Sequence, residues 1–116
     1  MEYTILTEEI TKAWSGFTTK EYKNFKNLKK DNLRDNMTNL ELVLNMLAEA
    51  TTTEISKKKK PKSFSQNKTI AKEGGKIAGN TRKEIENKTG ESIVSSKNAK
   101  SLKPKDHTNE IEENIK

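Results

Sequence analysis

The second half of the sequence concentrates lysine side chains, which bind polyanions by neutralising phosphates and releasing their counterions. Residues 57–105 contain fifteen basic and four acidic residues, a net charge of +11. Lysine greatly outnumbers arginine, so bidentate reading of base edges by arginine is not expected. The alternative interpretation is a solvated stretch whose charge serves solubility alone. The candidate nucleic-acid contacts are Lys57, Lys58, Lys59, Lys60, Lys62, Lys68, Lys72, Lys76, Arg82 and Lys83.

A second pattern in the same stretch is a set of small residues at helical spacing. The segment from Gly75 to Gly79 matches G-x-x-x-G, which lets one helix backbone approach another closely, and the lysines in the same turns exclude a membrane helix. Two interpretations stay open: close packing by another helix or strand, self-association included, and a flexible glycine hinge. The candidate packing or interaction residues are Ala71, Gly74, Gly75, Ala78 and Gly79.

Residue types that would support catalysis are scarce. The sequence has no cysteine, which excludes disulfides and thiolate chemistry. Its single histidine, His107, argues against a Ser-His-Asp hydrolase. Carboxylate pairs such as Glu8 and Glu9 lack a companion base or metal ligand. The glycines lack the lysine-serine pair of a phosphate-binding loop. We therefore expect no enzyme activity, no cofactor and no metal.

Length and composition predict one small domain with a modest core. The chain has 116 residues, of which 29% are hydrophobic and 34% charged, and its net charge of +6 is unevenly spread. Residues 1–56 carry −2 and residues 106–116 carry −3, while five of the six aromatic residues precede residue 26. The core is therefore expected at the N-terminus. No apolar run approaches the roughly 20 residues of a membrane span, so no membrane partner is expected.

The N-terminal unit is expected to contain three helices. Apolar residues recur on one helical face over about residues 4–14, and Gly16 supplies a stop. Capping-box patterns at Thr18 and Thr38, each with glutamate three positions later, open a second and a third helix. The wide apolar stripe of the third helix suggests burial on more than one side. The expected core residues are Trp14, Phe17, Tyr22, Phe25 and the apolar residues from Leu40 to Leu47.

The remaining chain divides into a linker, a helical segment and a tail. Four lysines followed by Pro61 predict a linker over residues 57–64. A basic helical segment is expected over residues 65–102, capped by Ser65, interrupted at Gly74 and Gly75, ended at Gly90, and followed by a short extended piece. An acidic, disordered tail is expected over residues 103–116. The predicted fold class is mainly α, with residues 1–56 as a small helical unit.

Three stretches together carry a family resemblance over most of residues 2–102. They include Gly16-Phe17-Thr18-Thr19 in the first, Leu33-Arg34-Asp35-Asn36-Met37 in the second, and Gly74-Gly75 with Thr89-Gly90 in the third. These stretches resemble the C-terminal region of the Bro-N family of phage antirepressors, often labelled DNA-damage-inducible protein D-like. None of the matching motifs is catalytic.

The resemblance implies a prophage-borne protein of the bacterial cytoplasm that regulates transcription. Family members carry an N-terminal Bro-N domain thought to bind DNA, and the chain looks like a truncated or detached C-terminal part without it. The expected function is a non-enzymatic regulatory module of a phage antirepressor with accessory lysine-based DNA contact. The alternative is a protein-interaction or oligomerisation module without DNA binding of its own. The expected partners are DNA, a repressor or another protein, or a second copy of the chain.

Overall fold

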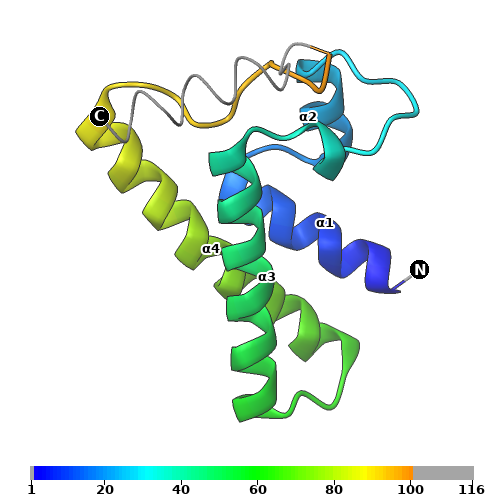
Figure 1. The fold of residues 1–116 in the computed structure, drawn as a ribbon. Coiled ribbons are helices and arrows are strands. Elements are labelled where there is room, and N and C mark those ends of the chain that lie inside the picture. The colour runs from blue at the N-terminus through cyan, green and yellow to red at the C-terminus, as the bar shows by residue number, and fades with distance from the viewer. Residues whose placement is uncertain (1, 101–116) are drawn as a thin grey trace.

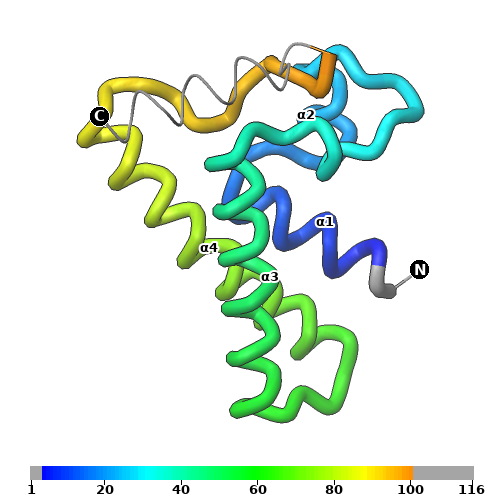
Figure 2. Tube along the Cα trace, viewed as in Figure 1, coloured from blue at the N-terminus to red at the C-terminus, as the bar shows by residue number. Residues whose placement is uncertain are grey.

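The computed structural model describes residues 2–100, with side chains from residue 4 onward, and shows a mainly helical chain (Figures 1 and 2). Within this range the elements are α1 (Glu2–Ser15), α2 (Thr19–Phe25), the 3-10 turn η1 (Arg34–Asn36), α3 (Asn39–Lys59) and α4 (Phe64–Thr89). The predicted mainly α fold class is confirmed. The expected tail over residues 103–116 lies outside the described residues.

Local capping signals set the starts of α2 and α3, as the sequence predicts. The Thr18 hydroxyl accepts from the Glu21 N–H at 3.1 Å, and the Glu21 carboxylate accepts from the Thr18 N–H at 2.8 Å. Thr38 and Glu41 repeat this arrangement at the start of α3. Gly16 follows α1 with a φ of +85°, a left-handed conformation that glycine adopts without strain. Both predicted capping boxes are confirmed.

The connection between α3 and α4 is shorter than the expected linker. α3 continues through three threonines and ends at Lys59, because lysines favour helix and interact well with the negative C-terminal end of the dipole. The hydroxyl of Thr52 donates to the carbonyl of Ala48 at 2.8 Å, which satisfies that hydroxyl within the helix. Only residues 60–63 are non-helical, and Ser63 rather than Ser65 caps α4.

α4 is one unbroken helix of 26 residues, so the expected interruption at its glycines is wrong. The physical reason is that the glycines lie where neighbouring helices touch α4. A Cβ built at Gly75 would stand 2.6 Å from the Ala13 Cβ, and one at Gly79 would stand 2.8 Å from the Ala13 carbonyl oxygen. The predicted end at Gly90 is confirmed, with a φ of +75°.

The small-residue face of α4 packs inside the chain. Gly75 and Gly79 lie against α1, and a Cβ at Gly74 would overlap Thr52 of α3. α4 therefore crosses beside α1 and α3, as Figure 1 shows. All five candidate packing residues, Ala71, Gly74, Gly75, Ala78 and Gly79, are buried.

The core extends beyond the N-terminal unit. Trp14, Tyr22 and Leu44 are packed together with Ala78 of α4 and with Val94 from the segment after it. Ile93 is also buried there, although residues 91–100 form neither helix nor strand. Figure 1 shows this segment returning from the end of α4 across the molecule toward α2.

Several residues expected in the core face solvent instead. Phe25 is 44% exposed, although its ring packs against that of Phe17 with 5.5 Å between centroids. Leu40, Val43 and Met46 are 39%, 57% and 49% exposed. α3 is thus buried on one side only, and the expected burial on more than one side is wrong.

Candidate nucleic-acid interface

The ten candidate cations fall into three groups in the structure. Four of them lie along one side of α4, five surround the α3–α4 connection, and one turns into the protein. We call the first group the lysine face and the second group the corner lysines. The lysine face consists of Lys68, Lys72, Lys76 and Lys83, and the corner lysines are Lys57, Lys58, Lys59, Lys60 and Lys62.

The lysine face follows from helical spacing on an uninterrupted α4. Lys68, Lys72 and Lys76 are four residues apart, and Lys83 follows seven residues later, so all four lie on the same side of the helix. At 1.5 Å per residue this face is about 22 Å long. The last three of these lysines are exposed and Lys68 is half-buried. Ammonium groups gathered on one side of a helix can neutralise several phosphates of a nucleic-acid strand.

The lysine face is nearly free of competing acids from its own helix. Glu73 precedes Lys76 by three residues but is paired with Lys59 of α3 at 3.2 Å, and Glu84 lies on another side of α4. Glu86 is engaged by Arg82 and by the N–H of Ile93, with distances of 2.8 and 2.9 Å to its two oxygens. The positive potential of the lysine face is therefore not cancelled by neighbours along α4.

Arg82 is a structural residue rather than a surface cation. Its Nε donates to the carbonyl of Trp14 at 2.8 Å, and its guanidinium pairs with Glu86. The Trp14 carbonyl is at the end of α1, where helix carbonyls lack partners within the helix. Arg82 thus fastens the end of α1 to α4, and only 17% of its side chain is exposed.

A groove between α1 and α4 brings in two residues that sequence reasoning missed. It has a volume of about 450 Å³ and is lined by Glu9, Lys12 and Ala13 of α1 and by Lys72 and Lys76 of α4. Lys12 adds a cation to the lysine face, and Glu9 is the one carboxylate that lines the groove. The sequence shows Glu9 only as one of a carboxylate pair and gives no signal at Lys12, because both residues reach the lysine face only when α1 packs on the glycines of α4.

The corner lysines are partly paired with acids of the same chain. Lys59 lies 3.2 Å from a Glu73 oxygen, and Lys57 lies 3.6 Å from a Glu54 oxygen, both on the surface. Such exposed pairs contribute little and exchange readily with other anions. The remaining three, Lys58, Lys60 and Lys62, are exposed.

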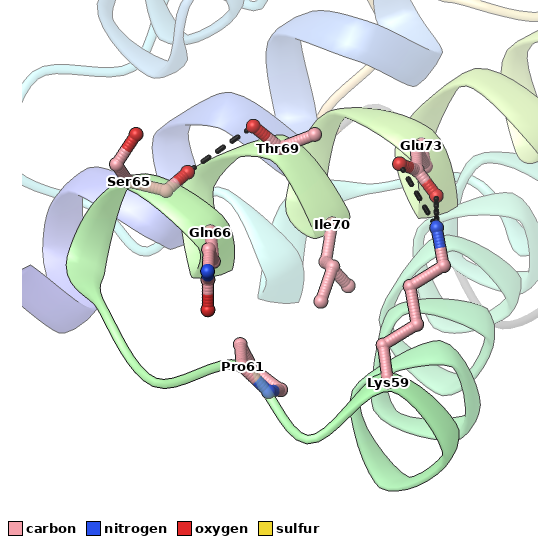
Figure 3. Close-up of a pocket in the computed structure, with 7 residues that line it drawn as sticks. All are labelled: Lys59, Pro61, Ser65, Gln66, Thr69, Ile70 and Glu73. Atoms are coloured by element: carbon pink, nitrogen blue, oxygen red, sulfur yellow. Dashed lines mark hydrogen bonds and ion pairs between the residues drawn. The ribbon is translucent and has the colours of Figure 1, made fainter.

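A pocket of about 440 Å³ lies beside the corner lysines (Figure 3). Ile70 forms its apolar part opposite Pro61, and the Lys59–Glu73 ion pair stands at one side. The hydroxyl of Thr69 is turned back to the Ser65 carbonyl at 3.1 Å. Thr69 thus donates to a backbone carbonyl and not to Glu73, which is paired with Lys59, so the lining shows no hydroxyl activated by a neighbouring base.

The one fully buried ion pair among the described residues is Lys26 with Glu41, at 2.7 Å. Glu41 also accepts from the Tyr22 hydroxyl and, at 3.1 Å, from the N–H of Ser95. Lys26 donates in addition to the carbonyl of Lys97 at 2.6 Å. Tyrosine, lysine and glutamate side chains can do acid–base chemistry, but these three are closed off from solvent. The cluster therefore holds the fold together rather than forming an active site.

Because Tyr22 is buried in its neutral form, the free energy of unfolding should fall at alkaline pH. Burial, and secondly the hydrogen bond to Glu41, raises the pKa of Tyr22 well above its usual value, whereas the unfolded chain ionises it near pH ~10. The stabilisation is fully present below about pH 10 and is lost as the pH rises above it. We expect the difference in free energy of unfolding between wild type and Tyr22→Phe to become smaller as the pH rises above about 10.

Urea unfolding of both proteins from about pH 8 to about pH 11 measures this difference. Ionisation of the lysines is common to both proteins and cancels in the comparison. A difference that stays constant across the range would contradict the role of the buried phenol.

Other site types are limited within residues 2–100. No group of three or more His, Cys, Asp or Glu there could hold a metal ion. None of the helices described is both long and apolar enough to cross a bilayer. Comparison with protein-family models, curated proteins and solved structures gives no match.

Proposed function

We propose that the chain is a non-enzymatic helical module that contacts the phosphate backbone of nucleic acid. The observation that carries this proposal is the lysine face: four lysines on one side of a continuous helix, with a fifth, Lys12, brought to it by α1. The corner lysines lie at the N-terminal end of the same helix and extend the positive surface. Counterion release from phosphates supplies the binding free energy.

Contact through lysine implies binding without reading of sequence. Lysine offers a hydrated point charge, whereas recognition of guanine edges depends on the planar fork of arginine, and Arg82 is engaged inside the protein. The choice of a DNA target would therefore come from another domain or protein. The resemblance to the C-terminal region of Bro-N antirepressors supports placing this accessory contact in a phage regulatory protein.

Removing lysines from the lysine face should lower the salt dependence of DNA binding. Each lysine that meets a phosphate contributes about −0.9 to the slope of log K against log salt, so four contribute about −3.6. We expect Lys72→Gln/Lys76→Gln to make the slope less negative by about 1.8 and to weaken binding. Fluorescence anisotropy of a labelled DNA duplex, titrated with each protein at several salt concentrations, measures both quantities.

The matched control is Lys29→Gln/Lys30→Gln, which removes the same charge from exposed positions between α2 and η1. If the control lowers the slope as much as the α4 variant, binding follows net charge and not the lysine face. Absence of wild-type binding at about 50 mM salt would overturn the proposed function, since even non-specific contacts are strong there.

The alternative, a protein-interaction or oligomerisation module, is favoured by a different surface. The small-residue face of α4 is filled by α1 and α3 of the same chain. Leu40, Val43 and Met46 instead form an exposed apolar face on α3. Failure to bind DNA, together with self-association that Val43→Ser/Met46→Ser abolishes, would favour this second function.

A further inference from the structure

The groove between α1 and α4 is lined mainly by lysines, as an anion site would be, and it contains one carboxylate of the protein itself. Lys12, Lys72 and Lys76 line it from two helices, and Glu9 is the carboxylate among them. The side chain of Glu9 is only 19% exposed, although it comes from a surface helix. The Glu9 side chain therefore lies within the groove and does not extend into solvent.

The Glu9 carboxylate is shared between two ammonium groups and bonded closely to neither. One oxygen lies 3.8 Å from the Lys68 nitrogen, and the other lies 3.9 Å from the Lys72 nitrogen. These distances exceed the 2.7–3.2 Å of a hydrogen bond, so the attraction is loose and easily replaced. The Lys68 and Lys72 side chains are 41% and 59% exposed, so an incoming anion can reach the same two nitrogens.

We propose that one backbone phosphate of nucleic acid binds in this groove, where Glu9 acts as its built-in competitor. The inference rests on the proposed function and adds to it a specific site and a residue that limits affinity. A phosphodiester carries one negative charge on two oxygens, as a carboxylate does, and four ammonium groups face or adjoin the groove. Their charge exceeds that of Glu9, so the groove attracts an anion while the carboxylate is in place.

The surroundings favour nucleic acid over an anionic membrane. A helix that lies on a bilayer presents an apolar stripe beside its basic residues. Beside the lysine face, α4 presents Asn80, an exposed polar residue that can contact phosphate or sugar oxygens. The four lysines lie in a line, which suits a strand of regularly spaced phosphates.

Replacing the competitor tests the inference. We expect Glu9→Gln to bind a DNA duplex about fivefold more tightly than wild type, because one unit charge about 4 Å away in water is removed. Glutamine keeps the size and helix preference of glutamate, so α1 should be unchanged. The measurement is fluorescence anisotropy at about 50 mM and about 150 mM salt, with the gain larger at the lower salt.

The matched control is Glu49→Gln. Glu49 is also a helical glutamate in a surface ion pair, with Arg34 at 2.9 Å, but it does not line the groove. The substitution changes net charge by the same amount, and its expected effect on DNA affinity is less than about twofold. Equal gains in both variants, or no gain in Glu9→Gln while wild type binds DNA, would overturn the inference and leave the proposed function standing.

A second measurement separates failure of the site from failure of the function. Inorganic pyrophosphate is titrated into 15N-labelled wild type and Glu9→Gln, and amide shifts of Ala13, Lys72 and Lys76 are followed by NMR. We expect saturable shifts at these residues, with tighter binding in Glu9→Gln. Shifts without any DNA binding would retain an anion site and overturn its assignment to nucleic acid. A gain on phosphatidylserine vesicles but not on DNA would assign the groove to lipid headgroups and overturn the proposal.

Discussion

Replacing Glu41 with glutamine is expected to lower the free energy of unfolding by about 3–5 kcal/mol. The substitution leaves Lys26, which is fully buried, without its counter-charge. It also places an amide N–H₂ opposite donors in either orientation. On the Oε2 side the amide would face the Tyr22 hydroxyl and the Ser95 N–H, and on the Oε1 side it would face the Lys26 ammonium and the Thr38 N–H. Because small domains are stable by only about 5–15 kcal/mol, this loss removes a large part of the total.

The second capping box supplies the control for this prediction. Glu21 occupies the same N3 position in α2 that Glu41 occupies in α3, but it lies on the surface. Glutamine is also accepted in a capping box, so Glu21→Gln should change stability little. Urea unfolding of both variants measures the contrast. Similar losses in the two would show that capping, and not the buried ion pair, is what Glu41 contributes.

A double substitution isolates the ion pair itself. Lys26→Met together with Glu41→Gln removes the buried cation along with its partner, so part of the lost stability should return. The residual loss should reflect the hydrogen bonds to Lys97 and Ser95, which tie residues 93–99 to the core. If the double variant is no more stable than Glu41→Gln alone, an uncompensated Lys26 is not the main cost of that substitution.

Elements governed by short-range interactions could be predicted from the sequence. The capping boxes at Thr18 and Thr38 act over three residues, and the stop at Gly90 depends on one residue's backbone freedom. The length of α3 was less predictable, because a run of lysines repels in isolation but favours the end of a long helix. Pattern alone did not decide between these two effects.

Features governed by tertiary contacts could not be predicted in the same way. Gly74 and Gly75 weaken an isolated helix, and only the backbones of α1 and α3 explain why α4 continues through them. Glu41 reads as a simple capping residue, yet it also bonds Ser95, which is 54 residues away. The exposure of Phe25 shows the converse, since its apolar spacing does not reveal that the residue stays 44% exposed beside Phe17.

In the candidate interface, too, some features follow from local spacing and others depend on tertiary contacts. The four-residue spacing of Lys68, Lys72 and Lys76 already indicates a common face on any helix, and the structure shows that helix. The inward turn of Arg82 depends on the free carbonyl at Trp14, far away in the sequence. The approach of Glu9 to the lysines requires the packing of α1 on the glycines, which no local motif describes.

Gly75→Ala should destabilise the fold although alanine is the better helix former. The added Cβ would stand 2.6 Å from the Ala13 Cβ and 2.8 Å from the Ile10 carbonyl oxygen. A backbone carbonyl cannot rotate away as a side chain can, so α1 and α4 must separate. Helix preference gains about 1 kcal/mol, and overpacking at a helix contact costs about 1–3 kcal/mol. We expect a net loss of up to about 2 kcal/mol, and a larger loss for Gly75→Leu.

Urea unfolding followed by fluorescence of Trp14, the one tryptophan of the chain, measures this effect at the contact itself. Asn80→Ala provides the control, because it adds helix preference at an exposed position of the same helix and should stabilise slightly. Ala13→Gly removes one of the two overlaps, so it should cost less stability in the Gly75→Ala background than in wild type, where only its lower helix preference counts. Stabilisation by Gly75→Ala would mean that α1 does not approach α4 this closely, and the groove that contains Glu9 and Lys72 would then lose its geometric basis.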